Sequence, residues 1–416
     1  ASVGWRISQE PWWNVKSEHI SNAKIRFSWG SLGNAAGLSN YQYIQTLGIS
    51  KSDYILGGLR QNYMSSPAAL PGNLTWETAT TYDIGADLGF FDNRLTVSGD
   101  YYIRKTTDMI VNGPTVPDVF GASSPKGNYA DMSTYGYELS LEWRDGFDLA
   151  GKRFNYSIKG TLADYYSVID RFNNANMSLS EYANQSLDKN YYEGMRIGEI
   201  WGFVSNGLWQ DQASIDAAEA AAKAAGQSYY NPLMQTSKTY TLYPGDIKFE
   251  DLNGNGYIDR GQNTVDDPGD RKIIGNSTRR YQYGIHGGAN WKGVSLSFLL
   301  QGVGKRDLWI MNDLFYPHYD AWTTVYDTQL NYWTPERTDS YFPRLYEKAA
   351  GNTAANTRIQ TRYLQDGSYL SIRNITLSYN FPSKWMTKIG VNNLAWSDSN
   401  LAAIASDRSI NTLMSG

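Results

Sequence analysis

Apolar and polar residues alternate one by one over several stretches of the chain, and this pattern constrains the fold more than any other feature. In residues 82–90 every second side chain is apolar, and the intervening ones are Asp or Gly. Successive side chains of a β-strand point to opposite faces, so this segment is predicted to be a strand with one apolar and one hydrated face. The alternation resumes at 95–104 after a turn at 91–94, which predicts a β-hairpin.

The same alternation recurs farther along the chain. Segments 135–144 and 154–162 are predicted to form a second pair of strands, and segments 281–291 and 294–300 a third. A strand at 369–381 changes register near Arg373-Asn374, which predicts a β-bulge. Weaker strands are expected at 1–7, 23–32 and 389–394. The sequence therefore predicts an all-β fold of about ten antiparallel strands.

The connections between these strands alternate strictly between short and long. The short ones are 91–94, 145–152, 292–293 and 382–388. The long ones are 33–73, 106–133, 165–279 and 304–368. A transmembrane β-barrel has tight turns at one end and long loops at the other, so the four long connections are predicted to be extracellular loops.

Aromatic residues support the barrel interpretation. The chain has 32 Tyr and 14 Trp, and the apolar faces of the strands begin and end in aromatics such as Tyr135 and Trp143. Tyr and Trp suit a membrane–water interface, although they also suit sugar binding. No stretch of eighteen apolar residues exists, which excludes a helical membrane protein.

Other function classes have little support in the sequence. The net charge of −4 gives no basic field that would attract nucleic acid. There is no cysteine, and the three histidines, His19, His286 and His318, lie in no nucleophile motif, so we do not expect an enzyme. One alternative remains open, because alternating strands also build soluble sheets. This alternative is a soluble or surface-bound carbohydrate-binding β-sandwich without transport.

A series of short motifs runs along the chain between residue 2 and about residue 394. The motifs are SVGWRIS (2–8), IRFSWGSLGN (25–34), LTWET (74–78), FFDNRL (90–95), YGYE (135–138), PGDIKF (244–249), DLNGNG (251–256), IGN (274–276) and LSIRNITL (370–377). In this order they resemble the SusC/RagA-like branch of TonB-dependent outer-membrane transporters, found in Bacteroidota.

This resemblance implies a plugged, lipid-embedded barrel of about 22 strands in the bacterial outer membrane. Residues 1–394 would form the C-terminal portion of that barrel, and TonB would act through an N-terminal region that has no counterpart here. The resemblance also implies a SusD-like surface lipoprotein as partner and a glycan or peptide as imported substrate. Residues 395–416 depart from the family pattern and are expected to be an atypical tail, truncated or unstructured.

Residues 251–259 match the first part of an EF-hand-type calcium loop, with oxygen ligands at positions 1, 3, 5, 7 and 9 and a glycine at 6. These ligands are Asp251, Asn253, Asn255, Tyr257 through its carbonyl, and Asp259. Position 12 is Gln262 rather than Glu. Asp270 resembles the closing acid of the family, and Asp266 or Asp267 could substitute for it. We expect either a structural Ca²⁺ or a metal-free turn rich in Asp and Asn.

The connection at 304–368 is rich in aromatic residues that could stack on a glycan or hold a peptide. The candidates for ligand binding are Trp309, Tyr316, Tyr319, Trp322 and Trp333. The alternative is that these rings pack the loop onto itself or onto a partner protein. A helix is also predicted within the preceding long connection, at residues 211–226, where an Ala-rich stretch ends at Gly226.

Overall fold

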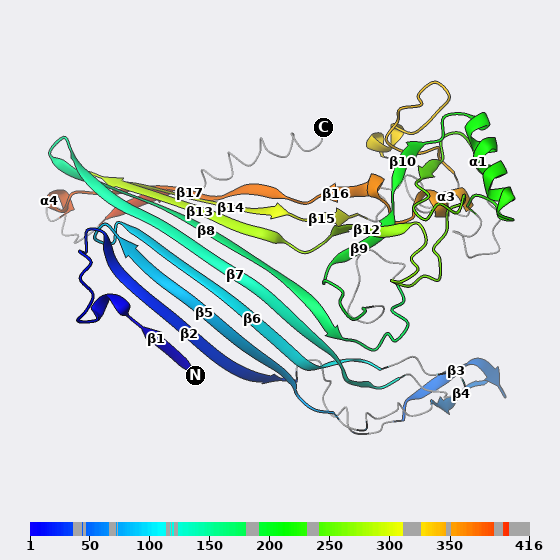
Figure 1. The fold of residues 1–416 in the computed structure, drawn as a ribbon, viewed down its shortest axis with the longest axis horizontal. Helices are drawn as coiled ribbons and strands as arrows, with labels where there is room; N and C mark the ends of the chain where they lie inside the picture. Colours follow the sequence, from blue (N-terminus) through cyan, green and yellow to red (C-terminus); the bar gives the residue numbers. More distant parts are fainter. Residues whose placement is uncertain are drawn as a thin grey trace.

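The computed structural model describes residues 1–35, 44, 47–65, 72, 74–113, 117, 119, 124–179, 191–230, 241–310, 326–346, 351–386 and 394–398. Its main feature is one long, curved antiparallel sheet of ten strands (Figure 1). The strands are β1 (Ser2–Trp5), β2 (Ile20–Asn34), β5 (Glu77–Phe90), β6 (Leu95–Asn112), β7 (Lys126–Leu149), β8 (Lys152–Arg171), β13 (Arg280–Trp291), β14 (Val294–Lys305), β17 (Tyr369–Asn380) and β18 (Ala395–Asp398). Each strand pairs with the next one in this order.

Strand pairing brings like side chains together on each face of the sheet. Leu139 of β7 lies opposite Gly99 of β6 and Leu162 of β8, whereas the next residue, Ser140, lies opposite Ser98 and Thr161. We call the first side the apolar face and the second the polar face. Because the period is two, this register keeps most of the apolar side chains of these strands on one side.

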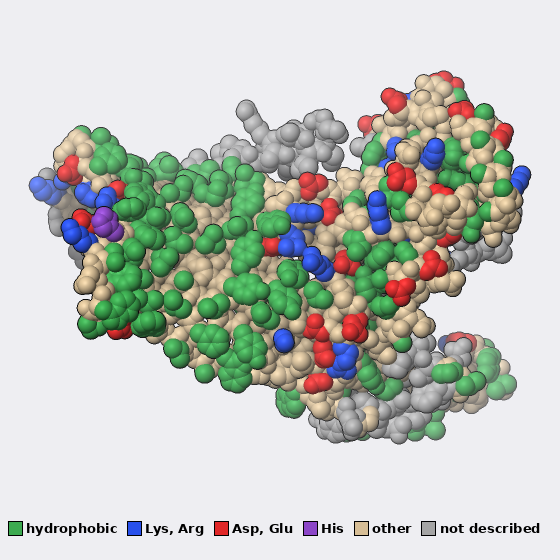
Figure 2. All heavy atoms as spheres, viewed as in Figure 1, with side chains coloured by type: hydrophobic (Ala, Val, Ile, Leu, Met, Phe, Trp, Pro, Cys, Tyr) green, Lys and Arg blue, Asp and Glu red, His purple; other side chains and the backbone are tan. Residues whose placement is uncertain are grey.

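The apolar face is uncovered. Leu139 and Ile158 are 43 % and 47 % exposed, and hydrophobic side chains form a broad band over one half of the molecule (Figure 2). In a β-sandwich this face would be packed against a second sheet. In the described part of the chain the other sheets have only two strands each and lie within the long connections. The sandwich alternative is therefore wrong, and the exposed band fits a surface that faces lipid.

Two-residue turns join β7 to β8 and β13 to β14 at one end of the sheet. Ala150 and Gly151 have φ of 48° and 71°, and Lys292 and Gly293 have φ of 48° and 88°. Positive φ at both central residues is the type I′ geometry that matches the twist of a β-hairpin. The turn predicted at 145–152 is thus shorter than expected, because β7 continues to Leu149.

The strands also reach farther than predicted at the other end. β6 continues to Asn112 and β7 begins at Lys126, so most of the predicted loop 106–133 is strand. The pairing of these two strands shifts between Thr106 and Met109, and this irregularity interrupts the alternation that the prediction followed. The bulge predicted near residue 373 is confirmed, because the register shifts between Asn374 and Ile372.

The barrel portion extends beyond residue 394, its predicted C-terminal boundary. Residues 395–398 were expected to belong to an unstructured tail, yet they form β18, which pairs with β17. Four residues are too few to show alternation, which explains the error. Residues 387–393 and 399–416 lie outside the described part of the chain, and with them almost all of the strand predicted at 389–394.

The long connections carry their own short elements. They are β3 (Ile49–Leu56), β4 (Leu59–Met64), β9 (Glu199–Phe203), β10 (Ser205–Leu208), α1 (Gln212–Ala224), β11 (Ile247–Phe249), β12 (Arg271–Asn276), β15 (Asp307–Trp309), η3 (Asp327–Leu330), α3 (Gly351–Asn356), η4 (Thr361–Tyr363) and β16 (Leu364–Asp366). Two more, η1 (Ile7–Gln9) and α4 (Ser383–Met386), lie in other connections. Helix α1 confirms the predicted helix, and Asp211 caps it by accepting a hydrogen bond from the backbone N–H of Ser214 at 2.8 Å. No helix in the described part of the chain is long and apolar enough to cross a membrane.

Candidate functional site on the polar face and the long connections

The polar face of the sheet contains two hollows. One, of about 500 Å³, is lined by side chains that include Asp100, Glu138, Thr161, Gln282 and Gln301. These residues come from five different strands, and the strand register brings them together on one side. The hollow therefore offers acids, amides and a hydroxyl, which can hydrogen-bond to a polar solute.

The second hollow, of about 600 Å³, lies near the two-residue turns. Three arginines line it, Arg94, Arg144 and Arg153, together with Asn155 and Asn290. Carboxylates partly neutralise it, because Arg144 pairs with Glu142 at 2.6 Å and Arg94 with Asp145 at 3.4 Å. His286 of β13 lies opposite Lys159 of β8 on the polar face.

An ion network ties the first strands of the polar face together. The Arg26 guanidinium of β2 lies 2.8 Å from Asp87 of β5 and 2.9 Å from Asp100 of β6. The hydroxyl of Ser98 also donates to Asp87, at 2.7 Å. The charges are about two-thirds shielded from solvent, so this network stiffens the wall rather than leaving free charge for a solute.

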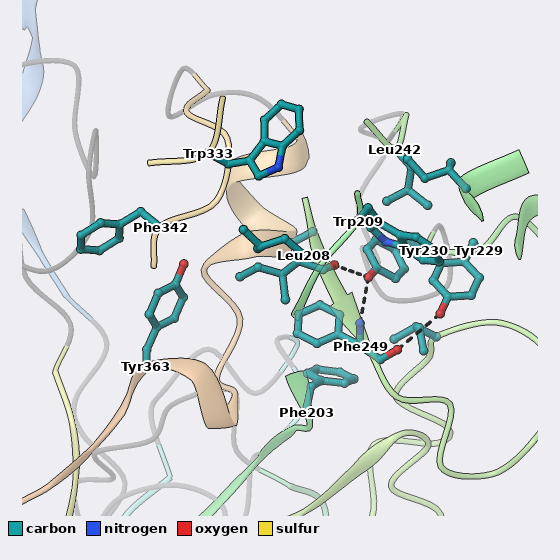
Figure 3. Packing of buried hydrophobic residues seen from close by; sticks show 14 of the residues in the cluster. Phe203, Leu208, Trp209, Tyr229, Tyr230, Leu242, Phe249, Trp333, Phe342 and Tyr363 are labelled. Atoms are coloured by element: carbon teal, nitrogen blue, oxygen red, sulfur yellow. Dashed lines mark hydrogen bonds between the residues drawn. The ribbon is translucent and has the colours of Figure 1, made fainter. Parts of the chain in front are cut away.

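The two longest connections, 172–279 and 306–368, pack together into an aromatic core (Figure 3). Tyr230 hydrogen-bonds to the backbone of both Ile247 and Phe249, and Trp333 and Phe342 reach the same core from the later connection. This is the main hydrophobic core of the described chain, and it lies in the connections because the sheet exposes both of its faces.

Two of the predicted ligand-binding aromatics belong to this core. Trp309 and Trp333 are only 4 % and 5 % exposed. Their rings pack against other residues of the two connections and present no open surface on which a sugar or peptide could stack, so ligand binding by these two stays a prediction. The alternative, that the rings pack the loop, holds for them. Tyr316, Tyr319 and Trp322 lie outside the described residues.

A buried carboxylate joins the two connections. Asp246 is fully buried and accepts hydrogen bonds from the amides of Asn352, at 2.8 Å, and Asn356, at 2.9 Å, both on α3. Burial raises the pKa of Asp246, while these donors oppose the rise. The PGDIKF motif at 244–249 does not by itself reveal that Asp246 joins the two connections, since its partners lie more than a hundred residues away.

The predicted calcium loop folds around two carboxylates. Asp251 accepts hydrogen bonds from the backbone N–H of Gly254 at 2.6 Å and of Gly256 at 2.7 Å. Asp270 accepts from the N–H of Leu252 at 2.7 Å and of Asp259 at 2.8 Å, and it is fully buried. Burial is the main cause that raises the pKa of Asp270 to about 6.

The remaining predicted ligands also bond within the loop. Asn253 accepts from the N–H of Asn255, Asn255 accepts from the N–H of Tyr257, and the amide of Asn255 donates to Asp259 at 2.6 Å. Among the described residues no three His, Asp or Glu side chains converge as they would around a metal. This arrangement fits a metal-free Asx-rich turn better than an open cation site, and the calcium ion stays a prediction.

Comparison with known proteins agrees with this architecture. The family described as "TonB dependent receptor-like, beta-barrel" matches residues 1–231. Among curated proteins, the chain is 27 % identical over 396 residues to TonB-dependent receptor P3 of Formosa agariphila, covering 94 % of the chain and 35 % of that protein. It is 24 % identical over 393 residues to TonB-dependent receptor SusC of Bacteroides thetaiotaomicron, covering 93 % of the chain and 34 % of SusC.

The solved RagAB peptide transporter has a similar fold. It matches with a TM-score of 0.65 and 20 % sequence identity, covering 95 % of the chain and 38 % of the solved one. The chain therefore spans about a third of the length of the curated relatives that it matches.

Proposed function

Because the chain belongs to the TonB-dependent receptor-like β-barrel family of the bacterial outer membrane, we propose that it forms the C-terminal part of the wall of a nutrient importer. In this role the apolar face contacts lipid and the polar face borders the path of the solute. The family match confirms the resemblance inferred from the motifs, and the similarity to a solved structure of the same fold confirms the predicted β-barrel.

The division of the sheet into two faces is the observation that carries this proposal. One face exposes a band of hydrophobic side chains, while the other holds two hollows lined by charged and hydrogen-bonding groups. A path for a polar solute requires a hydrated, hydrogen-bonding wall of this kind behind the lipid-facing side.

The proposed solute is an oligosaccharide or a peptide. Acids, arginines, amides and hydroxyls along the polar face can hydrogen-bond to either class. A solved structure of similar fold is described as a peptide transporter, which supports the peptide class, and the motif resemblance implies either class.

The proposed partners are a SusD-like surface lipoprotein at the long-connection end and TonB on the opposite side of the membrane. The packed core of the two long connections supports the first of these, because a preformed surface loses little entropy when a partner docks on it.

A matched pair of tryptophan substitutions tests the solute path in the full-length protein. Gly288 lies on the polar face, and a Cβ there would have its nearest neighbour, the Ser157 hydroxyl, at 3.5 Å. We expect Gly288→Trp to project into the hollow and to lower uptake severalfold. Gly160→Trp is the control, because Gly160 lies on the apolar face with nothing within 4 Å of its Cβ.

The assay is uptake of labelled oligosaccharides and labelled peptides by whole cells, with and without collapse of the proton gradient. Heat-modifiable migration on gels confirms that each variant has assembled. Energy-dependent uptake that falls in Gly288→Trp but not in Gly160→Trp supports the proposal and identifies the solute class. Unchanged uptake in an assembled Gly288→Trp protein would show that the solute does not pass along the polar face.

A further inference from the structure

Basic residues stand on the apolar face directly beyond the hydrophobic band, toward the long connections. Strand pairing aligns Lys105 of β6, Ser133 of β7 and Val168 of β8 in one row across the sheet, and Arg196 pairs with Val168 beyond them. Paired residues point to the same side, so Lys105 and Arg196 are the two ends of a row on the lipid-facing side. In Figure 2, Lys and Arg side chains gather beside the hydrophobic band.

The neighbouring row, toward the band, is aromatic. Tyr135 and Tyr166 lie opposite each other, and their rings stack with centroids 5.4 Å apart. The Arg196 guanidinium lies 4.8 Å from the centre of the Tyr166 ring, and the Arg280 guanidinium lies 5.8 Å from it. Tyr166 therefore holds two arginines on the same patch by cation–π contacts.

Of these two arginines, only Arg280 has its charge neutralised by a carboxylate. Arg280 makes two hydrogen bonds of 2.6 Å to the carboxylate of Asp164. Arg196 and Lys105 are exposed, and neither has a carboxylate partner within the described part of the chain. Asp170, two residues after Val168 on β8, accepts a hydrogen bond from the hydroxyl of Ser133.

The position of this patch limits what can neutralise it. Lys105 and Arg196 are separated by three strand spacings, or about 14 Å between their Cα atoms. They lie at the long-connection end of a lipid-facing wall, where the hydrocarbon layer gives way to the headgroups of the outer leaflet. A charge at that depth is stabilised by an anionic headgroup, and a guanidinium held in place on a ring is well suited to bind phosphate.

We propose that Lys105 and Arg196, with the Tyr135–Tyr166 pair between them, form a binding site for the phosphate group of an outer-leaflet glycolipid. The acyl chains would continue over the apolar face, past Leu139 and Leu141, which are both exposed. This inference goes beyond the proposed transport function, because it requires only that the sheet lies in the outer membrane with its long connections on the outer side.

The test measures lipid bound to the full-length protein. The protein is purified in mild detergent and mixed with monophosphorylated lipid A or with its dephosphorylated form, and native mass spectrometry counts the bound molecules. We expect the wild-type protein to prefer the phosphorylated form roughly tenfold or more, since two basic residues at a lipid surface attract the charged phosphate. The double variant Lys105→Gln/Arg196→Gln should lose this preference.

Lys292→Gln is the matched control. Lys292 lies 4.3 Å from the Trp291 ring, so it is also a cation on an aromatic residue, but at the opposite, short-turn end of the sheet. This variant should keep the wild-type preference.

Three outcomes would overturn the proposal. They are equal binding of the two lipids by the wild-type protein, an unchanged preference in the double variant, and displacement of the lipid by an excess of inorganic phosphate, which would indicate a free-anion site. If the double variant does not assemble, the wild-type comparison of the two lipids decides alone.

Discussion

Leu139 occupies the centre of the band that we assign to lipid, and replacing it with arginine tests that assignment directly. On β7 it lies midway between Tyr135 and Trp143, the two aromatic ends of the apolar face. Four residues span about 13 Å along a strand, or about 10 Å along the membrane normal for a tilted strand. Leu139 is therefore near the midplane of an apolar layer about 25 Å tall.

At that depth an arginine costs about 2–4 kcal/mol in a transmembrane barrel. This corresponds to a folding equilibrium that is lower by a factor of about 30 to 800. The matched change is Ser140→Arg, one residue later on the polar face. Ser140 borders the hollow of about 500 Å³ that also contains Asp100 and Glu138, so an arginine there has room and opposite charge. We expect it to change stability by less than about 1 kcal/mol.

The measurement is guanidinium unfolding of the full-length protein in lipid vesicles, with the midpoint of each variant compared at equal slope. Assembly in native outer membranes, followed by heat-modifiable migration, gives a second readout. A Ser140→Arg protein that is destabilised as much as Leu139→Arg would refute the assignment of the two faces. So would a Leu139→Arg protein that remains as stable as the wild type.

Three further predictions concern the ionic groups. Arg26→Ala should lower stability by about 1 kcal/mol, because Asp87 and Asp100 lose their partner, and a double-mutant cycle with Asp87→Ala should recover the coupling. Asp246→Ala should speed hydrogen exchange in both 241–249 and 351–356, since the buried amides of Asn352 and Asn356 both lose this carboxylate as an acceptor; faster exchange confined to one segment would contradict the role of Asp246 in joining the two connections. Asp270, whose folded pKa is raised from 3.8 to about 6, should make the 251–270 loop lose stability as the pH rises through that window, and Asp270→Asn should abolish this dependence. If calcium binds as the spacing predicts, it should restore the protection of the 251–270 loop from hydrogen exchange at pH 7 in the wild-type protein but not in Asp270→Asn, and a chelator should reverse the effect.

The strands could be predicted because each face of the sheet meets a uniform environment. Any apolar side chain satisfies the lipid side and any polar one satisfies the other, so period two shows directly which residues share a face, as it does from Tyr82 to Phe90. The prediction failed where the period itself is interrupted. The shift between Thr106 and Met109 concealed the ends of β6 and β7, and β18 was too short to show any alternation.

The connections could not be predicted in the same way, because their core is built from residues far apart in sequence. Asp246 meets Asn356 across 110 positions, and the backbone N–H of Ile247 donates to the same asparagine. No local period marks such pairs. The aromatic content of 304–368 left both binding and packing open for any single ring, and only the fold showed that Trp309 and Trp333 pack.

The glycolipid patch combines both kinds of information. Lys105 can be assigned to the lipid-facing side from the alternation of β6 alone, but an isolated lysine at the end of a strand is ordinary. Arg196 lies in a long connection with no period, and it reaches the rim only because residues 194–197 hydrogen-bond to the edge of β8 between Ser167 and Ile169. This contact places an arginine from a connection on the Tyr166 ring, at the level where lipid headgroups begin. A lysine on a single strand that extends its charge toward the headgroups is common in membrane proteins. A patch that also needs an arginine from a connection packed against β8 depends on this particular fold. It follows that breaking the hydrogen bonds between residues 194–197 and β8 should weaken binding of the phosphorylated lipid even when Lys105 and Arg196 are both retained.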